Sequence, residues 1–171
     1  KTYIMSSYSG AITELNVSEG SYVNEGDLLA HIKSTDLDMQ QENLESQKKI
    51  YQTQLDQYTK LLQCVQDDTN YFSETDSEDQ PYYYQYETYK SQVAQKTFDA
   101  SAYQSAGYSD TQIKTLMEQS QSELEALYYS TMQTISQNIT SAQTNVDNIQ
   151  AQIDSLNNGA NDYYIYAPTS G

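Results

Sequence analysis

The spacing of apolar residues divides the chain into three zones. In residues 1–34, short apolar runs alternate with glycine-containing turns, a pattern typical of a meander of short strands. From Thr35 onward, apolar residues recur in steps of three and four, which indicates helices. A strand-like run returns at Tyr163–Tyr166. The pattern predicts a mainly α-helical chain with a small β part.

The clearest helical pattern lies in the last third of the chain. Its apolar residues alternate steps of four and three, as in a coiled coil: Tyr128, Met132, Ile135, Ile139, Ala142, Val146, Ile149, Ile153 and Leu156. A slip in phase near Leu127 resembles a stutter. Ser109–Gln112 fits a capping box, and Asn157-Asn158-Gly159 fits a helix end. We therefore expect a helix over about 110–157.

A second coiled-coil stripe follows the first strands and predicts a helix over about 36–66. Thr35 is the expected N-cap, with Asp36 and Asp38 in the first turn, where the helix dipole favours acids. The heptad positions carry Leu37, Leu44, Tyr51, Tyr58 and Val65.

The middle of the chain allows two layouts. Tyr82, Tyr86, Tyr89 and Val93 predict a short helix over 81–98, preceded by an acidic segment. At about 1.5 Å per residue, the first two helices together span roughly the same length as the third, which favours a hairpin turn at 99–108. The alternative places the turn at 67–80. In either layout, 35–160 forms a helical hairpin between β segments 1–34 and 161–171.

Charge excludes several classes of partner. The chain of 171 residues has 24 acidic residues against 8 lysines and no arginine, a formal charge of −16. A field of that sign repels nucleic acid and anionic lipid, so we expect neither to bind. No apolar run approaches the roughly 20 residues of a membrane span. Because the chain opens almost directly into a strand-like run at Tyr3, we interpret it as a fragment whose membrane anchor lies elsewhere.

The residues that could carry chemistry do not form a recognisable set. His31 is the single histidine and Cys64 the single cysteine, and they are far apart in the sequence, so neither a zinc site nor a Ser–His–acid triad is expected. Four acidic residues cluster in the middle segment: Glu74, Asp76, Glu78 and Asp79. They lack the glycine and the spacing of an EF-hand, which favours a solvated loop. We expect no catalytic residue, no cofactor and no metal.

Tyrosine is the unusual residue of this chain, with 18 copies and no tryptophan. The tyrosines at 82–84, 86 and 89 cannot all face one helix seam, because consecutive helical residues point about 100° apart. Some of them must be exposed or meet another subunit. We take Tyr83, Tyr84, Tyr103 and Tyr108 as candidates for partner contact.

Two stretches resemble the HlyD-type membrane fusion proteins, also called periplasmic adaptors. Residues 9–30, from Ser9-Gly10-Ala11-Ile12 to Glu25-Gly26-Asp27-Leu28-Leu29-Ala30, are similar to the first lipoyl half-motif of that family, and residues 164–171 to the opening of the second. The middle segment, including 70–74, is similar to accessory proteins of Gram-positive bacteriocin and peptide-pheromone exporters. The resemblance implies a helical hairpin inserted into a lipoyl-like β domain, which is incomplete here.

The function implied by this resemblance is exerted through partners. It implies an adaptor on the extracytoplasmic side of the cell membrane that works beside an ABC exporter and its peptide cargo, as a scaffold or conduit wall, and that forms homo-oligomers. Adaptors that dock on TolC-like channels carry an Arg-Leu-Ser type motif near the hairpin tip. This chain has no arginine, so we expect no such channel as partner.

Two alternatives belong to other classes. A structural coiled-coil protein of the cell surface would need only the helical stripes. A biotin or lipoyl carrier would need a lysine nine residues after Asp27, where this chain has Asp36. The carrier is therefore the weakest of the three hypotheses.

Overall fold

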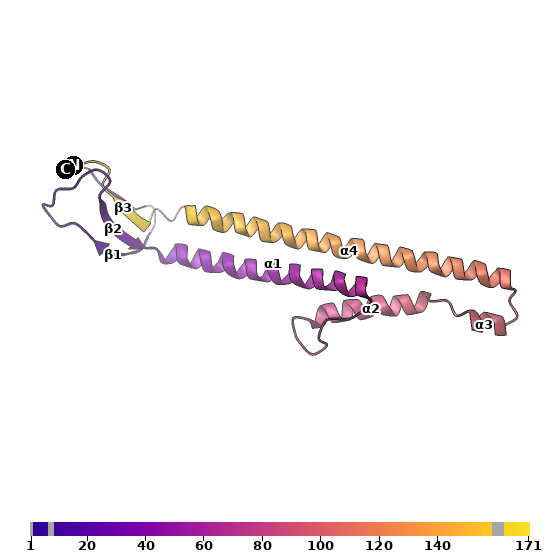
Figure 1. Ribbon diagram of the computed structural model, residues 1–171. Coiled ribbons are helices and arrows are strands. Elements are labelled where there is room, and N and C mark those ends of the chain that lie inside the picture. Colours follow the sequence, from indigo (N-terminus) through magenta and orange to yellow (C-terminus); the bar gives the residue numbers. More distant parts are fainter. Residues whose placement is uncertain (1, 7–8, 159–162) are drawn as a thin grey trace. The chain divides into compact units, whose positions relative to one another are not determined.

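A computed structural model describes residues 2–6, 9–158 and 163–171 (Figure 1). The chain is mainly helical with a small antiparallel sheet, as the apolar spacing predicts. Its elements are β1 (Ala11–Leu15), β2 (Leu28–Lys33), α1 (Thr35–Asp67), α2 (Gln80–Lys96), α3 (Ala100–Ser105), α4 (Asp110–Asn158) and β3 (Tyr164–Tyr166). They form two compact units, Lys1–Ile50 with Asn145–Gly171 and Tyr51–Thr144. Each unit is described by itself.

The first unit contains the sheet, whose order is β1-β2-β3 with both neighbours antiparallel to the central strand. The pairing continues beyond the strands. Gly26 N–H donates to the Ala167 carbonyl at 2.8 Å, and Val23 and Gly171 exchange two backbone hydrogen bonds of 2.9 and 3.0 Å. Segments from the two ends of the sequence therefore close on each other, on either side of the helical segment.

The apolar residues of the sheet are unequally covered. Leu29, Ala30 and Ile32 of β2 are buried, whereas all five residues of β1 are exposed. Ile12 and Leu15 of β1 keep 61% and 62% of their surface accessible. The central strand thus supplies the buried residues of β1 and β2. Elsewhere in this unit, apolar residues of α1, of α4 and of the segment after β3 are buried: Leu37, Val146, Ile149, Ile153 and Ala167.

Helix α1 begins at Thr35, one residue earlier than expected. The capping residue is Ser34, not Thr35: its buried Oγ accepts the Leu37 N–H at 3.4 Å, and its carbonyl accepts the Asp38 N–H. Both side chains are suitable caps, so the sequence does not distinguish them. Ser34 is fully buried directly after β2, a place that favours the smaller residue.

The second unit has a core contributed by three helices and a loop. Its buried residues are Leu61, Cys64, Val65, Phe72, Tyr86 and Ile135, with half-buried tyrosines around them. The Cys64 side chain is fully buried, and this burial raises the pKa of its thiol. Its Sγ accepts the Tyr71 N–H at 3.3 Å, so Cys64 serves as a packing residue at the end of α1.

Within this unit, α2 runs parallel to the last turns of α1 and antiparallel to α4 (Figure 1). Near its start Asp79 contacts Gln57, and further along Lys90 pairs with Asp68, so both helices advance in the same direction. At its end, Lys96 pairs with Glu123 of α4. The helices α1 and α2 therefore overlap, whereas the length argument from sequence placed them end to end.

Both segments considered as turns change the direction of the chain. Helix α1 ends where Asp68 adopts a left-handed φ of 52° and the Thr69 N–H bonds to the Cys64 carbonyl. The reversal before α4 lies between Lys96 and Asp110 and contains α3, which the sequence did not predict. The capping box at Ser109 is confirmed, because Ser109 and Gln112 bond reciprocally at 2.9 and 3.3 Å. The expected stop at Gly159 lies outside the described residues.

The sheet provides a first prediction, at Gly10. A Cβ at this position would collide with the carbonyl oxygen of Lys33 and approach the Ile32 side chain to 2.9 Å. We expect Gly10→Ala to lower the free energy of unfolding by about 1–3 kcal/mol, as overpacking typically does. Hydrogen exchange should accelerate in β1 and β2. Gly171→Ala is the control, because a Cβ there meets open space. Equal exchange rates in the two variants would contradict the prediction.

Candidate partner-contact surfaces

The single histidine, the first candidate for metal binding or catalysis, already contacts other side chains of the sheet. His31 lies in the central strand, its ring stacked on Tyr164 at 4.5 Å and its Nδ1 3.0 Å from the hydroxyl of Thr13. Among the described residues, no group of three or more His, Cys, Asp or Glu side chains is placed to hold a metal ion. The candidate functional features of this chain are therefore surfaces that could contact a partner.

Residues 68–79 form an acidic loop that is fastened to α1 through Asp79. Its carboxylate accepts the Ser73 N–H at 2.9 Å, the Gln57 amide at 2.8 Å and the Lys60 ammonium at 3.3 Å. These bonds, that of Ser73 foremost, hold the pKa of Asp79 below its usual value. Asp76 accepts two backbone N–H groups of the loop. Two of the four clustered carboxylates thus serve as internal acceptors of the loop.

The other end of the loop is fastened to α2. Lys90 pairs with Asp68, the Tyr86 hydroxyl donates to the same carboxylate at 3.4 Å, and the Asn70 amide donates to Glu87 at 2.9 Å. Burial, and to a lesser degree Asp68, raises the pKa of Tyr86. We call the bonds of Asp79 and Asp68 together the α2 clasp. They hold the loop and α2 against the end of α1.

The predicted α2 stripe forms the inner face of the helix. Tyr86 is 3% exposed, while Tyr82 meets the Tyr58 ring edge-on at 5.3 Å and stacks near Phe72 at 5.7 Å. Of the two partner-contact candidates here, Tyr83 is half-buried against the core, and Tyr84 keeps 49% of its surface exposed. Their rings pack perpendicularly at 5.3 Å. Tyr84 is therefore the more accessible candidate.

The other two candidates form an aromatic cluster around α3. Tyr103 stacks on Phe98 at 4.9 Å and meets the edge of Tyr108 at 5.1 Å. Tyr108 is 44% exposed and follows Gly107, whose φ of +87° favours glycine. Phe98 was not recognised as part of this cluster from the sequence. Its partners approach only because α3 and the turn at Gly107 bend the chain.

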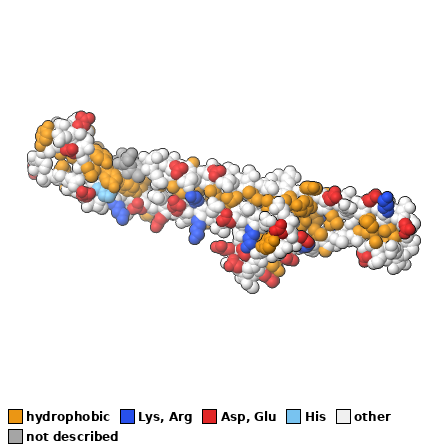
Figure 2. All heavy atoms as spheres, viewed as in Figure 1, with side chains coloured by type: hydrophobic (Ala, Val, Ile, Leu, Met, Phe, Trp, Pro, Cys, Tyr) orange, Lys and Arg blue, Asp and Glu red, His pale blue; other side chains and the backbone are white. Residues whose placement is uncertain are grey.

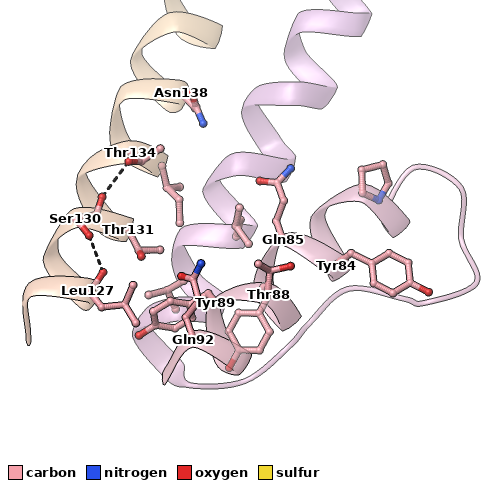
Figure 3. Close-up of a pocket in the computed structure, with 15 residues that line it drawn as sticks. Tyr84, Gln85, Thr88, Tyr89, Gln92, Leu127, Ser130, Thr131, Thr134 and Asn138 are labelled. Carbon is pink, nitrogen blue, oxygen red and sulfur yellow. Dashed lines mark hydrogen bonds between the residues drawn. The ribbon is translucent and has the colours of Figure 1, made fainter. Parts of the chain in front are cut away.

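A third surface is a hollow of about 500 Å³ between α2 and α4, here called the α2–α4 groove (Figure 3). It is lined by Leu61, Val65, Pro81, Tyr84, Gln85, Tyr86, Thr88, Tyr89, Gln92, Leu127, Ser130, Thr131, Thr134, Ile135 and Asn138. None of these residues is charged, although the chain carries a charge of −16. The helical stripes do not reveal this groove. A sequence signal does exist, because no charged residue lies between Glu125 and Asp147.

Comparison with known proteins shows a likeness of fold. No protein-family profile and no curated protein matches the sequence. A solved structure of the periplasmic adaptor protein EmrA is similar, with a TM-score of 0.55 and 14% identity. The match covers 99% of this chain and 64% of that one, so this chain spans about two thirds of its length. No helix in the described part of this chain is long and apolar enough to cross a membrane.

The α2 clasp provides a second prediction. Asp79→Ala removes hydrogen bonds to a charged acceptor, and we expect it to lower the free energy of unfolding by about 1–3 kcal/mol. The pKa of Asp79 is lower in the folded state than the ordinary aspartate value of about 3.9. Its contribution to stability is therefore present above that ordinary value and is lost as the pH falls through the folded-state pKa. Denaturation between pH 6 and 2 should therefore show a smaller acid dependence in Asp79→Asn than in the native chain. Glu78→Gln is the neighbouring control. An unchanged profile in Asp79→Asn would refute the role of Asp79.

The aromatic cluster provides a third prediction. Helix α3 contains no buried residue, so the stacking of Tyr103 on Phe98 is a main contact that holds this helix in place. Aromatic pairs contribute about 0.5–1.5 kcal/mol. We expect Tyr103→Ala to accelerate hydrogen exchange in α3 several-fold while α4 beyond its first turns stays unchanged. Gln104→Ala, an exposed neighbour, should leave α3 protected. If both variants exchange alike, the cluster does not hold α3.

Proposed function

We propose that this chain is part of a non-catalytic adaptor of the HlyD type, which serves an ABC exporter of peptides as scaffold or conduit wall. The observation that carries the proposal is the likeness in fold to a periplasmic adaptor over 99% of the chain. The protein would act on the extracytoplasmic side of the membrane, as a homo-oligomer anchored by a segment outside this chain.

The sheet supports this proposal independently of the helices. Residues 9–30, which resemble a lipoyl half-motif, contain β1 and the start of β2, and residues 164–171 contain β3. The two stretches are bonded to each other, as between Gly26 and Ala167. Ends that lie side by side allow a helical segment to be inserted without disturbing the β part.

The narrower assignment to Gram-positive peptide export rests on sequence. The middle segment is similar to accessory proteins of such exporters, and a chain without arginine cannot carry the Arg-Leu-Ser type motif. We therefore propose no TolC-like partner. Tyr84 and Tyr108 are the exposed candidates for contact with other subunits, because each keeps more than 40% of its surface accessible.

Crosslinking in membranes tests this function. A photo-reactive amino acid replaces Tyr84 or Tyr108 in the full-length protein, and crosslinked products are identified by mass spectrometry. We expect an ABC transporter subunit among them. Gln104, exposed on α3 between these positions in the sequence, is the matched site for background labelling. Capture of copies of the same chain alone, together with no transporter after general amine crosslinking, would favour the structural coiled-coil alternative.

A further inference from the structure

We propose that the α2–α4 groove binds a short extended peptide segment that lacks acidic side chains. Only the identification of this peptide as exported cargo rests on the function proposed above. The groove itself lies within Tyr51–Thr144, so its geometry belongs to one compact unit.

The walls of the groove have matching lengths. On α2 the lining runs from Pro81 to Gln92, and on α4 from Leu127 to Asn138, with lining residues on each successive turn. At about 1.5 Å per residue each wall is roughly 16 Å long. An extended peptide rises about 3.3 Å per residue, so about five residues fit between the walls.

The polar side chains of the walls suit a peptide backbone. In the part of the chain that the structure describes, no hydrogen bond engages the side-chain amides of Gln85, Gln92 and Asn138. Each of them offers a donor and an acceptor, the complement of a peptide C=O and N–H. The hydroxyls of Ser130 and Thr134 donate to α4 carbonyls at 3.1 and 3.0 Å, which leaves their oxygens to accept (Figure 3).

The apolar lining favours a peptide over a sugar. Leu127 and Tyr89 are half-buried and line the hollow, so they offer contact to an apolar side chain. A sugar would stack on a ring that stands free, whereas the Tyr89 ring lies tilted against the buried Tyr86, with 6.2 Å between the ring centroids. The ring of Tyr84 points away from α4 (Figure 3).

Electrostatics decides which peptides fit. The groove has no charged side chain to neutralise an acid, and the chain around it carries a charge of −16. Acidic side chains gather over the loop between α1 and α2, which leads into the Pro81 end of the groove (Figure 2). An acidic peptide would therefore be repelled, whereas a neutral or basic one would not.

Selection from a random peptide library tests the groove and does not require the cargo to be identified first. A displayed library of random heptapeptides is panned against the 171-residue chain and against Ser130→Trp, in which an indole fills the groove. Gln133→Trp, on an exposed position of α4 outside the groove, is the matched control. We expect peptides poor in Asp and Glu to be enriched at least tenfold on the native chain and on Gln133→Trp relative to Ser130→Trp.

A second variant keeps the test decisive if circular dichroism shows that Ser130→Trp does not fold. Thr134→Glu places a negative charge on the wall, and the selected sequences should shift toward Lys and Arg. Three outcomes would overturn the proposal: no enrichment on the native chain, equal enrichment on Ser130→Trp together with unshifted sequences on Thr134→Glu, or binding confined to a panel of glycans. Transporter capture without peptide enrichment would refute the groove alone. Peptide enrichment without transporter capture would refute the adaptor role alone.

Discussion

The burial of Tyr86 between α1 and α4 is the contact on which the second unit depends. Its ring joins a core of Cys64, Val65 and Ile135, while its hydroxyl reaches Asp68 at the end of α1. This contact seats α2 beside the last turns of α1. The acidic loop, the chain reversal at α3 and the α2–α4 groove all follow from that position, because each of them is bounded by α2.

Magnitudes show why the tyrosine dominates over the ion pair of Lys90 with Asp68. Full burial of a large apolar side chain contributes about 1.5–3 kcal/mol, whereas an exposed ion pair contributes about 0–1 kcal/mol. The pair of Lys90 with Asp68 is exposed, with 71% of the acidic side chain accessible. Salt that screens this pair therefore leaves α2 in place. The packing of Tyr86 therefore sets the wall of the groove more firmly than this ion pair does.

Sequence periodicity predicted the helices well because a buried stripe leaves a direct record in the chain. Ile135, Val146 and Ile153 are buried at the predicted spacing. The direction of α2 leaves no such record, since Tyr82 and Tyr86 would form the same stripe whether α2 extended α1 or overlapped it. The cap at Ser34 and the helix α3 depend on local geometry that the spacing does not encode. The candidates Tyr83 and Tyr84 differ in exposure for the same reason.

The groove was hidden from stripe analysis because its polar lining lies beside the apolar positions that such analysis counts, such as Tyr86, Tyr89 and Ile135. Ser130, Thr134 and Asn138 recur every four residues on the flank of the α4 stripe, within the uncharged stretch between Glu125 and Asp147. Serine, threonine and asparagine there add neither charge nor helix propensity. Exposed positions of α4 outside the groove, such as Gln133 and Gln137, are uncharged as well, so neutrality belongs to this whole stretch of the helix. What distinguishes the groove is that α2 lies opposite it, so that the polar side chains of two helices face one hollow.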